Sequence, residues 1–194
     1  PLSPYGNTKK ISEEIIEDFT KINSDFSAIS LRYFNPIGAH DSGKIGELPK
    51  GIPNNLMPYI TQTASGVREK LRVFGNDYPT KDGTPVRDYI HVVDLAYAHV
   101  LTLKYGIKKS HNPLILNVGT GKGHSVLEVI ETFKREVGVK LNFKIGNRRA
   151  GDVPSIYADN KKIVALFGWK PRYSLADALL HAWKWEQERK NHIG

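Results

Sequence analysis

A helix, a buried strand and a turn follow one another at the start of this chain, and this order constrains the fold more than any other feature. Apolar residues recur at helical spacing: Ile11, Ile15, Phe19 and Ile22. They predict an amphipathic helix over residues 4–22. Residues 28–34 are apolar and β-prone, and a turn is expected at Asn-Pro-Ile-Gly, residues 35–38. This is the repeating unit of a doubly wound α/β sheet, in which ligands bind at the carboxyl ends of the strands.

The rest of the chain alternates between helical and strand patterns. Helices are expected over residues 56–67, from Val93 to Leu103, over 126–137 and after Ser174, and strands over 71–74, 86–92, 114–118 and 141–145. Between residues 40 and 53 the composition shifts to Gly, Pro, Asp and Ser without periodicity. This segment is expected to be a crossing loop and a domain boundary.

Composition excludes several classes of protein. The 194 residues include no cysteine, so disulfides, thiolate zinc sites and cysteine nucleophiles are ruled out, while a reducing cytosol fits. The seven histidines show no metal-ligand spacing, and no metal site is expected. No apolar run approaches the ~20 residues that span a bilayer, and no signal segment opens the chain. The first residue is Pro1 rather than Met, which suggests an excerpt from a longer chain.

The net charge of +8 would suit an anionic partner such as nucleic acid or a nucleotide diphosphate. The basic residues are scattered, however, with pairs such as Arg148-Arg149 and no basic stripe. We therefore interpret the charge as a solvated surface and expect no nucleic-acid partner.

Tyr5 and Lys9 lie four residues apart near the start of the first predicted helix, so both project from one face of it. A tyrosine is a poor base at neutral pH, but a nearby ammonium stabilises the phenolate. The pair is a candidate general acid/base. On spacing alone, a solvated helix face is the better interpretation.

Gly119-Thr120-Gly121-Lys122-Gly123 follows a predicted strand and precedes a predicted helix, as a phosphate-binding loop does. It matches neither a complete Walker pattern nor GxGxxG. A tight turn is therefore expected here.

Four blocks occur in the order of one known family. They are Tyr5-Gly6-Asn7-Thr8-Lys9 with Leu31-Arg32-Tyr33-Phe34-Asn35-Pro36, then Gly51-Ile52-Pro53-Asn54-Asn55-Leu56-Met57-Pro58-Tyr59, Val86-Arg87-Asp88-Tyr89-Ile90-His91-Val92 and Arg148-Arg149-Ala150-Gly151-Asp152. Over essentially its whole length the chain resembles the UDP-galactose 4-epimerases, NAD-dependent members of the extended short-chain dehydrogenase/reductase family. The blocks after YxxxK are more specific than that motif.

The resemblance implies a role for each matched position. Tyr5 would be the acid/base at the sugar 4-hydroxyl, Lys9 would hold the nicotinamide ribose, and Phe34 would touch the cofactor. The implied substrate-binding residues are Asn35, Asn55 and Leu56 along the UDP-sugar, Phe74 beside the uracil, Arg87 and Arg149 on the diphosphate, Tyr89, and Asp152 at the nucleoside end. Ile156 would face the C2 substituent of the sugar, where family members carry either tyrosine or a small residue.

The resemblance also implies a fold, a cofactor and an assembly. Residues 1–39 would be the C-terminal remnant of a Rossmann-type NAD-binding domain. Residues 40–194 would form mainly a smaller, mixed α/β UDP-sugar-binding domain, with the option that some segments return to the first. The intact enzyme would be a cytoplasmic homodimer that interconverts UDP-galactose and UDP-glucose with NAD. The family's glycine-rich N-terminal unit does not occur in this chain, so the chain by itself is expected to be inactive.

Two alternatives stay open. One is another enzyme of the same superfamily, such as a nucleotide-sugar dehydratase, although Asn54-Asn55-Leu56-Met57 argues against it. The other is a non-catalytic module that binds nucleotide sugars or, through its charge, nucleic acid. Binding to DNA or RNA that depends on the salt concentration would support a nucleic-acid-binding module.

Overall fold

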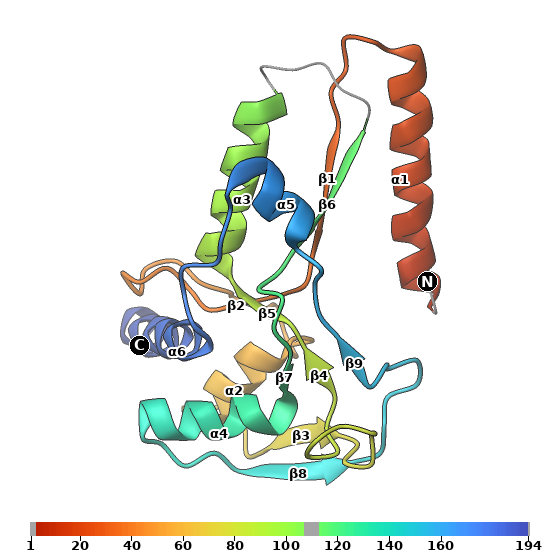
Figure 1. Ribbon diagram of the computed structural model, residues 1–194. Coiled ribbons are helices and arrows are strands. Elements are labelled where there is room, and N and C mark those ends of the chain that lie inside the picture. Colours follow the sequence, from red (N-terminus) through yellow and green to blue (C-terminus); the bar gives the residue numbers. More distant parts are fainter. Residues whose placement is uncertain (1–2, 107–112, 194) are drawn as a thin grey trace.

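The computed structural model describes residues 3–106 and 113–193 of the chain. In its upper part, β1 (Ile29–Tyr33) and β6 (Leu114–Val118) pair in parallel, with Leu31 opposite Leu116. Helix α1 (Pro4–Ile22) lies on one side of this pair, and α3 (Val92–Gly106) and α5 (Lys161–Phe167) lie on the other (Figure 1). Helices on both faces of parallel strands confirm the expected α/β class.

The lower part holds a second parallel pair, β3 (Leu71–Phe74) and β8 (Phe143–Gly146). Helices α2 (Leu56–Ala64), α4 (Val126–Val137) and α6 (Leu175–Ile193) pack together beside it (Figure 1). A small sheet completes this part, in which β4 (Val86–Arg87) lies between β7 (His124–Ser125) and β9 (Ser155–Ile156).

Strand β5 (Tyr89–His91) lies between the two parts and pairs in parallel with β2 (Asn35–Ile37). Successive side chains of a strand point to opposite faces. Tyr89 accordingly belongs to the core of the lower part, whereas Ile90 belongs to the core formed by α3, α5 and β6. One short strand therefore supplies residues to both hydrophobic cores.

The sequence patterns predict most elements, with informative exceptions. The strand expected over residues 86–92 is broken at Asp88, because β4 and β5 pair with different sheets. The turn expected at residues 35–38 is largely strand β2. Strands β7 and β9 and helix α5 are too short to give a periodic signal. In the segment between β3 and β4, φ at Gly83 is +79°, a value that favours glycine.

Helix ends follow the expected capping chemistry. Ser125 and Glu128 form a capping box at the start of α4, in which the Ser125 hydroxyl accepts from the Glu128 N–H. Ser174 accepts in the same way from the N–H of Asp177 at 3.1 Å and so begins α6. Each cap satisfies a backbone donor that the helix leaves unpaired.

Helix α1 is attached differently from the others, since it contains no buried residue. An ion pair between Glu13 and Arg32 links it to β1, and Arg32 Nε lies 2.7 Å from the carboxylate. The hydrogen bond from Arg32 lowers the pKa of Glu13. Among the described helices, none combines the length and hydropathy that a membrane crossing requires.

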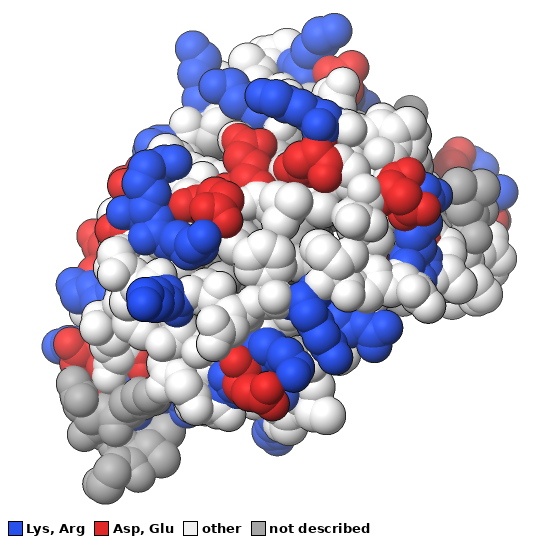
Figure 2. Space-filling model, turned by 90° about the horizontal axis from the view of Figure 1, so that it is seen from below, with Lys and Arg blue, Asp and Glu red and all other residues white. Residues whose placement is uncertain are grey.

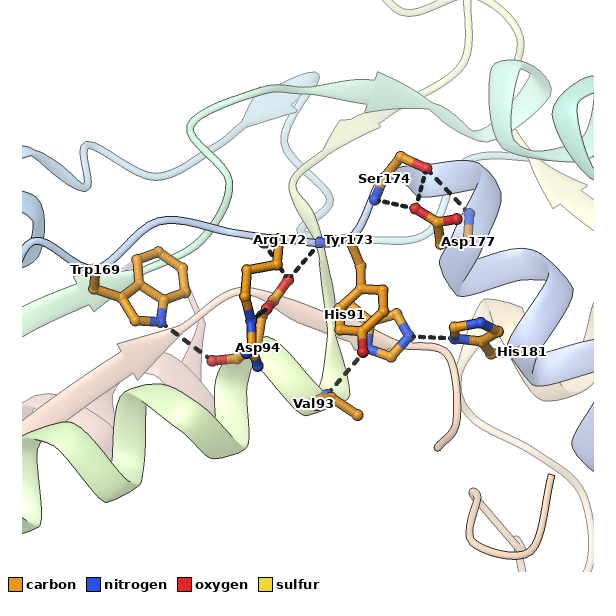
Figure 3. A network of polar contacts seen from close by, with 9 residues as sticks. All are labelled: His91, Val93, Asp94, Trp169, Arg172, Tyr173, Ser174, Asp177 and His181. Atoms are coloured by element: carbon orange, nitrogen blue, oxygen red, sulfur yellow. Dashed lines mark hydrogen bonds and ion pairs between the residues drawn. The ribbon is translucent and has the colours of Figure 1, made fainter. Parts of the chain in front are cut away.

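A buried polar network joins α3 to α6 and to the turn between α5 and α6 (Figure 3). The fully buried carboxylate of Asp94 accepts from the backbone N–H groups of Arg172 at 2.9 Å and Tyr173 at 3.0 Å. The indole N–H of the buried Trp169 donates to the Asp94 carbonyl. These bonds fix the chain just before α6 begins.

His91 continues this network into α6. Its Nδ1 accepts from the Val93 N–H at 3.1 Å, which assigns the ring proton to Nε2, and Nε2 faces His181 Nδ1 at 3.1 Å (Figure 3). Tyr173 stacks on the ring, with centroids 4.2 Å apart. Burial, reinforced by His181, lowers the pKa of His91 to about 4. Nearby carboxylates oppose this shift: Asp94, Asp177 and Asp41.

We expect this lowered pKa to make folding stability depend on pH. Between about pH 6.5 and pH 4 an unfolded histidine binds a proton that His91 excludes in the folded state, so stability falls as the pH drops through this window. From pH 7.5 to pH 5 the loss amounts to about 2 kcal/mol of unfolding free energy for this group. Urea unfolding at both pH values measures it. His91→Gln, which does not titrate, should flatten the dependence, and an equal slope in both proteins would contradict the assignment.

Candidate functional site

A cavity of about 480 Å³ opens where strands and loops from distant parts of the chain meet. Strands β2 and β3, the turn before α2, the β4–β5 segment and the loop before β9 all contribute to its wall. All predicted substrate-binding residues except Ile156 line it: Asn35, Asn55, Leu56, Phe74, Arg87, Tyr89, Arg149 and Asp152. The structure thus brings together residues that are spread over more than half of the sequence.

Arg87 is held rigidly on β4. Its Nη1 donates to the carbonyls of Val86 at 2.8 Å and Val153 at 2.9 Å, and its Nη2 contacts the Asp152 carboxylate at 3.3 Å. The side chain is 15% exposed. These bonds orient the guanidinium while leaving other N–H donors of its fork for an anion.

Arg148 and Arg149 are neighbours with different surroundings. Arg148 pairs with Asp77, with Nε 2.7 Å from the carboxylate, and lies over the Tyr78 ring. Arg149 lies over the Phe74 ring at 4.1 Å and lines the cavity. Only the second arginine is therefore available to a ligand in the cavity.

Arg72 also lines the cavity, lying 5.0 Å from the Phe74 ring on the same exposed face of β3. A side chain at Gly146 would meet the Arg72 guanidinium at 2.3 Å, so glycine makes room for it. With Arg87 and Arg149 it gives the cavity a basic character. Elsewhere, basic and acidic side chains are intermixed on the face seen in Figure 2.

Polar uncharged groups line the other side of the cavity. The amide of Asn55 donates to Glu47 at 2.8 Å, which leaves its oxygen free to accept. Burial raises the pKa of the Tyr89 hydroxyl, so this group stays neutral and can both donate and accept. The cavity therefore offers cationic donors and neutral polar partners together.

The remaining predicted residues lie outside this cavity wall. Lys9 Nζ lies 5.1 Å from the centroid of the Tyr5 ring, as the helical spacing predicts, and both side chains are exposed. Phe34 follows β1 and is half-buried. Ile156 lies on β9, directly opposite Arg87 in the strand register. The roles of these residues stay predictions.

The sequence patterns did not indicate several residues of the cavity. Arg72, Tyr59 and Asn54 line the wall, and Glu47 orients Asn55. Asn54 and Tyr59 stand inside a recognised block, which could have indicated them. For Arg72 the sequence offered one indication, namely a charged residue between the apolar Leu71 and Val73 of a predicted strand. Among residues 3–106 and 113–193, no group of acidic or histidine side chains is arranged to hold a metal ion.

Parallel strands flanked by helices, with a basic cavity beside them, define a protein of the α/β class. The family model described as GDP-mannose 4,6 dehydratase matches residues 1–181, and the chain belongs to this family of extended short-chain dehydrogenases/reductases. Within it, the chain is similar to UDP-glucose 4-epimerases. That of Bacillus subtilis (strain 168) is 47% identical over 189 residues, covering 97% of this chain and 56% of the relative.

The chain is also similar to solved structures of UDP-glucose 4-epimerases. The UDP-glucose 4-epimerase of Stenotrophomonas maltophila, with bound NAD and formylated UDP-arabinopyranose, matches at a TM-score of 0.93 and 47% identity, over 98% of this chain and 56% of that one. The enzyme of Bifidobacterium longum, in complex with NAD+ and UDP, matches at 0.93 and 42% identity, over 97% and 56%. The chain thus spans about half the length of the relatives that it matches.

Proposed function

We propose that the protein to which this chain belongs interconverts UDP-galactose and UDP-glucose. The observation that carries the proposal is the single cavity that gathers Asn35, Asn55, Phe74, Arg87 and Arg149. Its volume lies within the roughly 300–1,000 Å³ of small-molecule sites. The similarity to UDP-glucose 4-epimerases supports the same conclusion.

In the proposed binding mode, Arg87 and Arg149 hold the diphosphate. A guanidinium presents paired donors that match phosphate oxygens. Phe74 lies beside the uracil, Asp152 reaches the nucleoside, and the neutral side chains along the opposite wall receive the sugar hydroxyls. Arg149 lies over the Phe74 ring, so the side chains proposed to contact the diphosphate and the uracil are neighbours, as this binding mode requires.

The cofactor of the proposed reaction is NAD, and the residues present fit one end of it. Tyr5 and Lys9 are exposed side by side on α1, and no hydrogen bond joins their side-chain polar atoms to another described residue. With Phe34 they would hold the nicotinamide and its ribose. When bound, the cofactor would accept hydride from C4 of the sugar and return it.

The protein's own part in the chemistry is proton transfer. The Tyr5 phenolate, which the Lys9 ammonium stabilises, removes the proton of the sugar 4-hydroxyl, and the neutral phenol so formed later returns it. The arginines of the cavity keep the diphosphate anchored while the sugar turns over. The isolated chain, which carries only this part of the site, is expected to be inactive.

A dehydratase is the second candidate, because the matching family model carries that description. The 47% identity to UDP-glucose 4-epimerase and the Asn54-Asn55 pair in the cavity wall favour the epimerase. Product analysis decides between them, since a dehydratase releases a 4-keto-6-deoxy sugar and an epimerase releases the C4 epimer.

The proposal extends to organisation. We infer that residues 1–39 belong to a Rossmann-type NAD-binding domain and that residues 40–194 form mainly the UDP-sugar-binding domain. The parallel pairing of β1 with β6 supports the return of residues 114–118 to the first domain. A cytoplasmic homodimer is proposed for the intact enzyme.

Binding of UDP to the 194-residue chain tests the cavity directly. Arg149→Ala should weaken UDP binding by about tenfold to a hundredfold, because a charge-assisted hydrogen bond to phosphate is lost. Arg148→Ala is the matched control, since it removes the same charge from a neighbour that faces Asp77, and should change the affinity less than threefold or so. Calorimetry measures both. Equal losses in the two variants would refute the assignment.

Replacement of Tyr5 by Phe should lower kcat by roughly 10² to 10⁴ in a protein that carries this chain together with an NAD-binding segment, because only the proton-transfer group is removed.

Replacement of Lys9 by Met in the same protein should lower kcat and move its pH profile to higher pH, since the phenolate loses its stabilising ammonium. A Lys9→Met profile that stays in place would count against this role.

Ile156 is proposed to set tolerance at the sugar C2 position. Isoleucine is shorter than tyrosine but branched and stiff, so we expect UDP-galactose to be preferred and UDP-N-acetylgalactosamine to be turned over less well. In the intact enzyme, Ile156→Gly should raise the relative kcat/KM for the N-acetyl sugar, and Ile156→Tyr should lower it. A flat ratio across both variants would mean that Ile156 serves only the packing of β9.

A further inference from the structure

The carboxylate of Asp88 is fully buried at the break between β4 and β5. Its Oδ1 accepts from the N–H and hydroxyl of Thr120, at 2.9 and 2.7 Å. Its Oδ2 accepts from the N–H groups of Gly121 at 2.9 Å and Ala158 at 3.1 Å. A buried carboxylate needs such donors, because an unsatisfied one is very costly.

These bonds account for the glycine-rich segment at residues 119–123. Backbone N–H groups that could have cradled a phosphate donate instead to a carboxylate of the protein itself. A side chain at Gly119 would lie 2.6 Å from Asp88 Oδ2 and 2.7 Å from the Ala158 side chain, so only glycine permits this close approach. The N–H groups of this loop are therefore already occupied by the Asp88 carboxylate, which stands where a phosphate would otherwise bind.

The segments that meet at Asp88 also carry candidate site residues. Arg87 and Tyr89 precede and follow it in the cavity wall, and its carbonyl accepts from the N–H of Asn35 at 3.0 Å. On the other side, Ala158 stands two residues after Ile156. The Asp88 carboxylate thus links the wall of the cavity to β9, the strand that carries Ile156 and its proposed contact with the sugar C2 substituent.

Strand β9 needs such an anchor. It consists of Ser155 and Ile156 alone, both exposed, and it pairs with β4 over these two residues only. So short a pairing, without buried side chains, fixes its register weakly. The bond from Ala158 to Asp88 holds the chain immediately after it.

We infer that Asp88 is a positioning residue that sets the distance between β9 and the cavity wall, and thereby the fit of the sugar. The inference rests on the proposed function, because it assumes that a UDP-sugar occupies the cavity. Loss of these bonds should weaken binding of the sugar more than binding of the nucleotide. Arg87 is held separately by Val86, Val153 and Asp152, and Arg149 and Phe74 come from other segments.

The experiment compares UDP and UDP-glucose binding to the 194-residue chain by calorimetry. Asp88→Asn should weaken UDP-glucose about tenfold, since hydrogen bonds to the charge are lost, while UDP changes less than about threefold. Thr120→Val keeps the carboxylate and should shift the ratio of the two affinities in the same direction by less. Thr102→Val is the control, because its buried hydroxyl bonds only within α3, and should leave the ratio unchanged.

Amide hydrogen exchange supplies a readout that needs no ligand. Protection of the Ala158 and Gly121 amides should fall in Asp88→Asn, and protection of Ala158 should also fall in Thr120→Val. If Asp88→Asn does not fold, Thr120→Val decides. Binding that persists with an unchanged affinity ratio in the folded variants would overturn the inference. If the unaltered chain binds neither ligand, the proposed function fails, and unchanged Ala158 protection would then refute the anchoring role separately.

Discussion

The alternation of side chains along β5 holds the two halves of this structure together. Tyr89 enters one hydrophobic core and Ile90 the other, so a register slip by one residue would exchange a phenol ring and an aliphatic chain between cores that each fit only one of them. The residues that flank this pair, Asp88 and His91, are buried polar groups whose partners lie on several other elements. The strand is short, and its burial on both faces explains why it can nevertheless fix its neighbours.

The candidate site follows from this arrangement. Polar and charged side chains can gather at strand ends because the strands themselves are buried and leave their termini at the surface. Arg87, on β4 just before the break at Asp88, is oriented by the carbonyls of Val86 and Val153 and by Asp152 rather than by a ligand. Such prior orientation reduces the conformational entropy that binding must overcome. The cavity is thus a product of the same backbone geometry that separates the two cores.

The sequence predicted what depends on local periodicity and on recognised blocks. The helices at residues 4–22 and 126–137 and the strand at residues 114–118 have patterns long enough to be read from one chain. The break at Asp88 and the short strand β9 could not be predicted, because they depend on partners more than 30 residues away. The same holds for Arg72, whose guanidinium lies against Gly146 on another strand, where a side chain would overlap its position.

Helix α1 carries Tyr5 and Lys9 but contributes no buried residue, and apolar side chains on it are exposed, with Ile15 at 64% and Ile22 at 83%. We therefore expect the cooperative unfolding unit of this chain to consist of the two cores and the segments between them, with α1 outside it. Such a helix opens locally at a free energy well below that of global unfolding. The acid/base pair and the cavity thus belong to regions of unequal local stability, so the order of α1 can vary in this chain while the cavity keeps its shape.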